Sequence, residues 1–399
     1  MELENNMPEG WDEATLGDVC ENISRRFNFE QKESVVFVNT GDVLNGKFLH
    51  QKKISKEGLP GQAKKAIEYG DILYSEIRPA NKRFALVDFD SKDYVVSTKF
   101  MVLKKNDKID LDFFYLFLKS DKTIKAFQSH AEARSGTFPQ ITFDTISLDE
   151  ILLPSLTEQK AIAKVLTAFD DKIELLQAQN KTLETMAQTI FKERFGKYQI
   201  GDELPEGWRV GEFGELFDLT MGLSPKGDSY NHDMKGVPLL NGAGDYTGEK
   251  LDPKRYTSKP TRINKVGDLV FCIRGTIGKI VFADTEYCLG RGVAALSPKE
   301  SNDKYFNYIK LKRIIDELTR NATGSVILGL SKDDIKKAEL ILPSRIKLDE
   351  FSEIVKTLFN KIEINQNQLQ SLTITRDTLL PKLMSGQVRV KNLKQTADA

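Results

Sequence analysis

Two long segments of the chain carry apolar residues at alternating steps of four and three positions. Such a spacing repeats every 3.5 residues or so and is typical of a helix packed along a narrow seam against a partner helix, rather than of an ordinary surface helix. The seam positions are Ile162, Leu166, Phe169, Ile173, Leu176, Asn180, Leu183, Ala187 and Ile190 in the first segment, and Phe351, Val355, Leu358, Ile362, Asn365, Leu369, Leu372, Arg376 and Leu379 in the second.

Both ends of this helical pattern carry local signals. The tetrapeptide from Ser155 to Glu158 follows Pro154 and fits a capping box, which predicts a helix start there. Pro381 stands near the end of the second segment and is expected to distort its final turn.

The asparagine in each seam indicates how the two helices pair. In a parallel pair, Asn180 would face Leu369 and Asn365 would face Leu176, and each unpartnered buried amide would cost roughly 1–3 kcal/mol. In an antiparallel pair whose ends coincide, Asn180 faces Asn365. We therefore predict an antiparallel coiled coil within one chain, with its register fixed by the two asparagines.

The first seam spans about 42 Å at ~1.5 Å per residue. A turn of DNA measures ~34–36 Å, so this length suits a spacer that holds two recognition units about one turn apart. The alternative is a helix pair that serves only for packing or dimerisation and does not set a distance between recognition units.

Short runs with strand composition precede each long segment, and each set ends in an apolar helical stretch. We therefore expect two α+β units, each with a largely β core. The predicted strands are 35–38, 71–74, 83–88 and 94–103 in the first half and 237–240, 267–273, 278–283 and 292–297 in the second; the helices are 112–127 and 305–318.

The two halves are colinear copies of one another. MPEGW at Met7 recurs as LPEGW at Leu204, and GDILYSEIR at Gly70 recurs as GDLVFCIR at Gly267, an offset of 197 in both cases. The Pro-Ser dipeptides before the long helices, at 154 and 343, are 189 apart. A pseudo-two-fold repeat of this kind suits a bipartite target better than a single active-site cleft.

Composition favours an ordinary globular protein of two domains. The 399 residues are 40% hydrophobic and 29% charged, with a formal net charge of zero. No apolar run approaches the roughly 20 residues of a membrane span, and the first residues lack the apolar core of a signal peptide, so a cytoplasmic protein is expected. Any nucleic-acid affinity must come from local basic patches.

Cysteine and histidine usage predicts neither disulfides nor a metal site. Cys20, Cys272 and Cys288 are too few and too scattered for a disulfide framework, and are expected to be reduced structural thiols. The three histidines, His50, His130 and His232, have no partner at metal-ligand spacing.

One segment has the spacing of a phosphate-binding loop. Gly41 to Lys47 matches it, but Phe48 stands where the magnesium-binding hydroxyl belongs, and no helix start follows. At an offset of 202, the Lys47 position becomes Glu249. We expect a strand-turn-strand element in both copies and no nucleotide site.

Other catalytic patterns are weaker still. Asp245 with Asp252 and Lys254 has the loose form of a nuclease site, but the first half has no equivalent. Gly242-Ala243-Gly244 is a lone short glycine pattern, and no NPPY-like methyltransferase tetrapeptide occurs. We expect no catalytic residues on this chain.

Polar and basic residues gather at the ends and turns of the predicted strands, where they could contact phosphates or base edges. For any single residue a solvated surface charge is the alternative. The candidates are Arg25, Arg26, Asn28, Arg78, Asn81, Lys82, Arg83, Arg134, Ser135, Thr137 and Gln140 in the first half, and Ser224, Lys226, Asn241, Arg255, Arg274, Thr276, Lys279, Arg291, Asn321, Thr323 and Ser325 in the second. The halves differ most in these turns, so two copies of one scaffold would read two different short sequences.

With these features the chain resembles the specificity subunits of Type I restriction–modification systems. The resemblance rests on the duplicated layout, on GDLVFCIRGTIGK at Gly267, on LPSLTEQKAIAKVL at Leu153 and on LLPKLMSGQVRV at Leu379. The second helix entry, LPSRIKLDEF at Leu342, departs from the TEQ pattern of the first, which bears on the partner contact there.

The resemblance implies two target recognition domains on an antiparallel two-helix spacer, each reading one half of a bipartite asymmetric DNA site. It places the domains at residues 1–153 and 198–342, the spacer helices at 154–197 and 343–386, and a flexible tail at 387–399. It implies that the outer faces of the helices dock two modification subunits, which carry S-adenosylmethionine and methylate an adenine flipped from the duplex, and that restriction subunits add ATP-driven, Mg-dependent cleavage.

Three other readings stay open. A stand-alone DNA-binding or scaffold protein would share the repeat without a methyltransferase partner. A specificity subunit of another methylation-based defence system would look nearly alike. An intrinsic nuclease would show metal-dependent cutting that Asp252→Ala abolishes.

Overall fold

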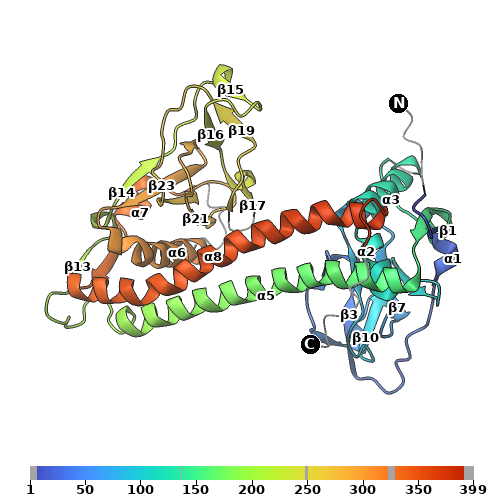
Figure 1. The fold of residues 1–399 in the computed structure, drawn as a ribbon. Helices are drawn as coiled ribbons and strands as arrows, with labels where there is room; N and C mark the ends of the chain where they lie inside the picture. The colour runs from blue at the N-terminus through green and yellow to red at the C-terminus, as the bar shows by residue number, and fades with distance from the viewer. Residues whose placement is uncertain (1–6, 135, 248–249, 322–328, 391–399) are drawn as a thin grey trace, which may run out of the picture. The chain divides into compact units, whose positions relative to one another are not determined.

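A computed structural model describes residues 7–134, 136–247, 250–321 and 329–390, with the side chains of 319–321 left out. The chain forms two compact units. Unit 1 comprises Met1–Leu176 and Gln368–Ala399, and unit 2 comprises Gln177–Asn367. The two long helices, α5 (Leu156–Phe195) and α8 (Arg345–Met384), each contribute one half to each unit (Figure 1).

Unit 1 contains two four-stranded sheets, with strand orders β6-β3-β10-β7 and β2-β11-β8-β9, and the small pairs β1-β12 and β4-β5. All strand pairs are antiparallel except β3 and β10. The elements are β1 (Asp12–Thr15), α1 (Leu16–Val19), β2 (Cys20–Asn22), β3 (Ser34–Val38), η1 (Thr40–Asp42), β4 (Val43–Leu44), β5 (Lys47–Phe48), β6 (Lys53–Ser55), η2 (Lys56–Gly58), β7 (Ala63–Ala66), β8 (Ile72–Ser75), η3 (Pro79–Asn81), β9 (Phe84–Leu86), β10 (Tyr94–Ser97), β11 (Phe100–Lys105), α2 (Leu111–Leu118), α3 (Asp121–Arg134), α4 (Phe143–Ile146) and β12 (Glu150–Leu153).

Unit 2 repeats most of this topology, but its strand β15 pairs with β19, the counterpart of β6, whereas β7 in unit 1 pairs with β10, the counterpart of β22. Its sheets are β15-β19-β16-β22 and β14-β23-β20-β21, the parallel pair is β16 and β22, and the small pairs are β13-β24 and β17-β18. The elements are β13 (Arg209–Glu212), η4 (Phe213–Glu215), β14 (Phe217–Met221), η5 (Gly227–Ser229), β15 (Tyr230–Asn231), β16 (Val237–Leu240), η6 (Ala243–Asp245), β17 (Tyr246–Thr247), β18 (Lys250–Leu251), β19 (Arg255–Thr257), β20 (Leu269–Cys272), β21 (Ile280–Phe282), β22 (Cys288–Leu289), β23 (Val293–Pro298), η7 (Ser301–Asp303), α6 (Lys304–Asn321), α7 (Lys332–Lys336) and β24 (Glu339–Leu342). The predicted duplication is therefore present in the strand pairing itself.

Two predicted elements of unit 1 are each divided in the structure. The strand predicted over 94–103 is two strands, β10 and β11, which belong to different sheets and are separated by Thr98 and Lys99. The helix predicted over 112–127 is α2 and α3, with a break at Lys119 and Ser120 where the Ser120 hydroxyl accepts the Thr123 amide and caps α3. Short polar runs, 97–99 and 119–122, mark both breaks in the sequence, and the prediction wrongly continued each element across them.

The segment with phosphate-loop spacing forms the predicted strand-turn-strand element in both copies. It is the hairpin β4-β5 in unit 1 and β17-β18 in unit 2. The copies align at an offset of 203 rather than 202, since η1 begins at Thr40 and η6 at Ala243. Lys47 therefore corresponds to Lys250 and not to Glu249, which lies outside the described residues.

The long helices run antiparallel within each unit. In unit 2, Arg194 lies 3.3 Å from Glu350, and Asn365 Nδ2 donates to Asn180 Oδ1 at 2.9 Å. In unit 1, Arg376 pairs with Asp170 at 2.8 Å. Later residues of α8 thus contact earlier residues of α5, as in an antiparallel pair. The predicted asparagine pair is present and buried. Every predicted seam residue on both helices is buried or half-buried.

The helix ends partly match the prediction. α5 begins at Leu156, and the Ser155 hydroxyl accepts the Glu158 amide at 3.3 Å, as in a capping box. α8 continues through Pro381 to Met384. Arg389 donates to both carboxylate oxygens of Glu158, at 2.6 and 2.7 Å. Residues 391–399 lie outside the described residues, and the flexible tail from 387 stays a prediction.

The asparagine pair gives a first prediction. Asn180→Leu should destabilise unit 2 by about 1–3 kcal/mol, because the amide of Asn365 would stay buried without its partner. Thermal unfolding of the single and double leucine variants measures the effect. The double variant should recover most of the loss. A double variant as unstable as the sum of the two single changes would show that the pair does not act together.

An ion-pair cluster holds the domain of unit 1 to its helices. Asp170 on α5 accepts from Lys119 Nζ at 2.5 Å and from Arg376 Nη1 on α8 at 2.8 Å. Partial burial by itself raises the pKa of Asp170, but the bonds and charges of Lys119 and Arg376 together outweigh it and hold this pKa below its ordinary value. In unit 2, Glu184 on α5 plays a similar part, since it accepts from Lys312 Nζ at 2.5 Å and from the Tyr308 hydroxyl at 2.8 Å, both on α6.

A second prediction follows from the lowered pKa of Asp170. Asp170→Asn should lower the stability of unit 1 at neutral pH by about 1–3 kcal/mol. Because the folded-state pKa is depressed, this contribution is complete above the ordinary carboxyl value of about 4 and disappears as the pH falls through the folded-state pKa. The gap in unfolding midpoint between variant and wild type should therefore shrink in acid. The exposed neighbour Asp171→Asn is the matched control, and an equal effect there would refute the cluster's role.

Among the described residues, no helix is long and apolar enough to cross a membrane. The three cysteines are buried and free. The described part of the chain also contains no group of three or more histidine, cysteine or acidic residues placed to hold a metal ion.

Candidate nucleic-acid interface

In unit 2, the ends of four strands meet at one edge of the two sheets. The amide of Gly290 donates to Leu240 O at 2.7 Å, which joins the loop after β22 to the end of β16. The amide of Ile273, at the end of β20, donates to Gly292 O at 2.9 Å. The loop Gly290–Gly292 therefore connects the end of one sheet to the end of the other.

Glycines allow this close approach of backbones. A side-chain carbon on Gly292 would collide with Asn241 O, and one on Gly222, just after β14, would collide with Gly290 O. Two backbone segments thus lie directly against the Gly290–Gly292 loop, and only glycine fits. This packing fixes the position of Arg291 between the two glycines.

The edge brings together five of the residues predicted from the sequence. The Arg291 amide donates to Ser224 Oγ at 3.2 Å, and Asn241 follows β16. Arg255 on β19 pairs with Leu239, two residues before Asn241. Arg274 follows Ile273, and its side chain lies against Gly329. The side chains of Arg255, Arg274 and Arg291 are exposed. Three cations and two polar groups at one strand edge form a surface suited to phosphates and base edges.

Unit 1 has the corresponding edge. The amide of Glu76, just after β8, donates to Lys99 O at 3.0 Å, the counterpart of the bond from Ile273 to Gly292. The amide of Arg78 donates to Pro139 O at 3.1 Å, and Ile77 is bridged to Gln140. Arg78 and Gln140 are thus brought together from distant parts of the sequence, and the Arg78 side chain is exposed.

Sequence reasoning missed three residues at the edge of unit 1. Thr98 and Lys99 occupy the turn that corresponds to Arg291 and Gly292, because β11 and β23 begin 193 residues apart, at Phe100 and Val293. Asn39 follows β3 as Asn241 follows β16. If the sequence prediction had divided 94–103 into two strands, it would have placed a turn at Thr98.

Three predicted DNA contacts are engaged within the protein instead. Arg25 is ion-paired with the buried Asp71 and lies 3.4 Å from Glu68. Arg83 and Lys279 donate to backbone carbonyls of neighbouring turns. These contacts hold the three side chains toward internal acceptors, and their assignment to direct DNA contact stays a prediction.

The other candidates stay predictions. Arg26, Asn28, Asn81, Thr137, Lys226 and Thr276 are exposed. Lys82 pairs with Asp121 at 3.1 Å, and Arg134 donates to Thr142 Oγ1 at 3.2 Å, both near the surface. Ser135, Thr323, Ser325 and the side chain of Asn321 lie outside the described residues.

The residues of the loose nuclease pattern have structural partners. Asp245 Oδ2 accepts the amides of Asn241 and Gly242 at 2.6 and 3.1 Å. Asp252 is ion-paired with Lys254 and accepts from Thr247 at 3.0 Å. Both carboxylates therefore stabilise the turns around η6 and the hairpin β17-β18.

Two units that share most of their strand pairing, each with a polar strand edge and one half of a helix pair, define a duplicated recognition protein. A family model described as Type I restriction modification DNA specificity domain matches residues 8–185 and 205–373, and the chain belongs to this family. Its members are specificity subunits, which are non-catalytic.

Individual relatives are similar in sequence to this protein over nearly the whole chain. The specificity subunit of the type I restriction enzyme HindI from Haemophilus influenzae is 33% identical, over 95% of this chain and 99% of the relative. The putative MjaX specificity subunit from Methanocaldococcus jannaschii is 27% identical, over 96% and 95% respectively. A crystal structure of a Type-I restriction-modification system S subunit from M. genitalium has a TM-score of 0.59 at 19% identity, over 96% of this chain and 98% of that one, and supports the fold alone.

Proposed function

We propose that each unit reads one half of a bipartite, asymmetric DNA site through the strand edge described above. The observation that supports this proposal is a shared backbone framework with different side chains. The hydrogen bond from Glu76 to Lys99 in unit 1 is equivalent to that from Ile273 to Gly292 in unit 2, while the side chains at the edge differ. A shared framework with different reading residues binds two different sequences. The lengths of α5 and α8 set the unread gap between them.

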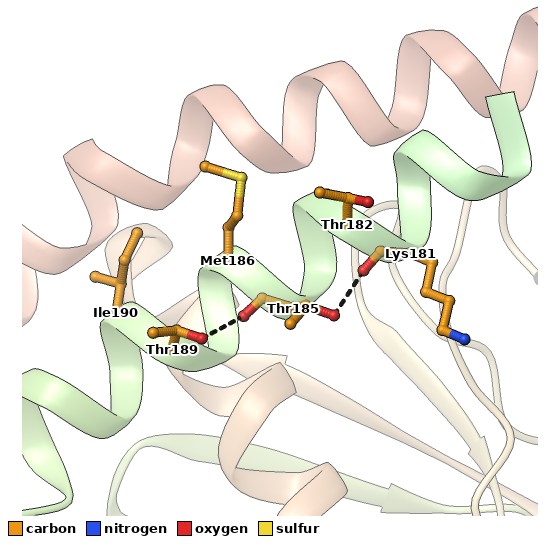
Figure 2. Close-up of a pocket in the computed structure, with 6 residues that line it drawn as sticks. All are labelled: Lys181, Thr182, Thr185, Met186, Thr189 and Ile190. Carbon is orange, nitrogen blue, oxygen red and sulfur yellow. Dashed lines mark hydrogen bonds between the residues drawn. The ribbon is translucent and has the colours of Figure 1, made fainter. Parts of the chain in front are cut away.

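The helices also provide docking surfaces for modification subunits. On α5, a shallow groove of about 460 Å³ is lined within unit 2 by residues one turn apart (Figure 2). The hydroxyls of Thr182, Thr185 and Thr189 each donate to the carbonyl four residues earlier, at 3.0, 2.8 and 2.9 Å. Their methyl groups, together with Met186 and Ile190, therefore present an apolar stripe suited to a partner protein.

The repeat places a second stripe on α8, within unit 1. At the helix offset of 189, Thr185, Met186 and Thr189 correspond to Ile374, Thr375 and Thr378, all exposed. Ile374 is 59% exposed and Met186 is 46% exposed, so both side chains are available to a partner. Two equivalent stripes support the binding of two copies of one partner.

In the assembled complex, the modification subunits would supply S-adenosylmethionine and methylate a flipped adenine in each half-site. Restriction subunits with ATP and Mg would make the complex an ATP-dependent endonuclease. This chain contributes the choice of DNA sequence and no catalytic residue of its own.

The stripes give a third prediction, on stoichiometry. Met186→Glu should lower the number of bound modification subunits from two to one, since a buried unpaired carboxylate opposes docking. Adding Thr375→Glu should remove the second copy. Native mass spectrometry of the co-purified complex counts the subunits. Gln188→Glu, an exposed change on α5 outside the groove lining, should leave two bound. Two bound subunits in the double variant would contradict these docking surfaces, and no co-purification of wild type would favour a stand-alone DNA-binding protein.

A further inference from the structure

A basic residue just before the edge strand of each reading sheet holds a neighbouring turn. In unit 1, Arg83 Nη1 donates to Gly41 O at 3.0 Å and to Val43 O at 2.9 Å. In unit 2, Lys279 Nζ donates to Ala243 O at 3.1 Å and lies 5.7 Å from the centre of the Tyr246 ring. Both cations bond to carbonyls of the same turn, although one residue is arginine, the other is lysine, and the carbonyls differ in position.

The two residues are equivalent in the repeat. Arg83 O accepts the amide of Ser75, the last residue of β8, at 2.9 Å, and Lys279 O accepts the amide of Cys272, the last residue of β20, at 3.0 Å. Their targets are equivalent too, because Thr40–Asp42 and Ala243–Asp245 are the matching turns η1 and η6. Duplication has therefore retained this cation-to-carbonyl contact while the surrounding turns diverged.

An asparagine precedes each turn. Asn39 lies directly before η1, and its Oδ1 accepts the amide of Thr40 at 2.8 Å, whereas Asn241 lies two residues before η6. The amide of Asn39 donates to Asp42 Oδ2 at 2.8 Å, and the amide of Asn241 donates to Asp245 Oδ2 at 2.6 Å. The turn carboxylate thus fixes the asparagine backbone from one side, and the cation fixes the turn carbonyls from the other. In unit 2 the Asn241 backbone also lies directly against Gly292, beside Arg291.

The chemistry of the contact sets the role of the cation. A carbonyl that accepts a charged donor forms a shorter and stronger bond than one with a neutral donor, which suits a rigid turn. The contact holds Arg83 Nη1 and Lys279 Nζ toward the turn carbonyls. Both side chains are half-buried, in contrast to the exposed Arg78, Arg274 and Arg291 at the same edges.

We propose that Arg83 and Lys279 are positioning residues for half-site recognition: each locks the turn that carries Asn39 or Asn241 at the reading edge and does not itself contact DNA. The proposal rests on the proposed function, because it assumes that each edge reads one half-site. It assigns each cation to a single half-site, Arg83 to the one read by unit 1 and Lys279 to the one read by unit 2.

The test uses the complex of this chain with its modification subunits and short duplexes that carry the mapped site. Wild-type affinity is measured against duplexes with substitutions in one half-site or the other, over a range of salt concentrations. Arg83→Met and Lys279→Met remove the charge and the donor at similar length. Arg83→Lys and Lys279→Arg keep both.

Each methionine variant should lose about tenfold or more of its discrimination in its own half-site and keep discrimination in the other, which also shows that the chain has folded. The slope of log affinity against log salt should stay unchanged, and the conservative variants should recover most of the discrimination. A slope reduced by about 0.9 with discrimination intact would identify a phosphate contact and overturn the proposal. Equal loss in both half-sites, or no loss in either, would also overturn it. If wild type itself shows no dependence on two separate half-sites, the proposed function fails independently.

Discussion

Replacing residues 206–342 with a copy of residues 9–153 should give a complex that recognises the first half-site twice and no longer recognises the second. The exchange is structurally mild, because each domain begins and ends on a two-stranded sheet. Asp12 pairs with Leu153 in β1-β12, and Arg209 pairs with Leu342 in β13-β24. The two cut points in unit 2 are therefore adjacent, and the copied segment presents its own ends in the same way.

Sequencing of methylated bases in DNA exposed to the chimeric complex reads out this exchange. The unread gap should stay unchanged, since α5 and α8 are untouched. The reciprocal chimera, with the second domain in both places, is the matched control and should recognise only the second half-site. A chimera that alters both halves of the motif, or neither, would show that the domains do not read DNA independently.

Insertion of one heptad into each long helix should abolish methylation of the parental site. Duplicating residues 173–179 in α5 and 366–372 in α8 adds a seam repeat on the same side of the pair Asn180–Asn365, so the antiparallel register is kept. Seven residues lengthen a helix by about 10.5 Å, close to the rise of three base pairs. Since DNA turns once in ~10–10.5 base pairs, the parental half-sites would be displaced in both distance and rotation.

Any site that the insertion variant still methylates should retain both half-sites and have a gap longer by about three base pairs. Insertion into α5 alone is the control. It moves Asn180 away from Asn365 and should destabilise the chain rather than change the gap. Unchanged methylation of the parental site by the double-insertion variant would show that helix length does not set the spacing.

Much of this architecture follows from the sequence because its signals are local or repetitive. The seam of α5 and α8 is a periodic pattern over nine positions on each helix, and the cost of an unpartnered amide decides between parallel and antiparallel pairing. The observed bond between Asn180 and Asn365 follows from those two facts alone. The duplication also predicts two units of one topology without any knowledge of the strand order.

The strand edges could be predicted only in part, because they depend on contacts between distant segments. In the sequence, Arg83 and Lys279 are basic residues near predicted strand ends, as Arg274 and Arg291 are. Only the contacts of Arg83 with Gly41 and of Lys279 with Ala243 show that these two side chains face inward. Arg25 lies beside Arg26 in the chain, yet its guanidinium pairs with Asp71. Thr98 was missed because the short polar run 97–99 was taken as part of one strand rather than as the turn between β10 and β11.

We propose that this chain directs methylation through two separate half-sites read by its two units. A map of methylated adenines in DNA modified by the complex that contains this chain tests the proposal. We expect a split motif whose two halves differ and whose gap is fixed. A continuous palindrome, or a motif without a gap, would contradict it.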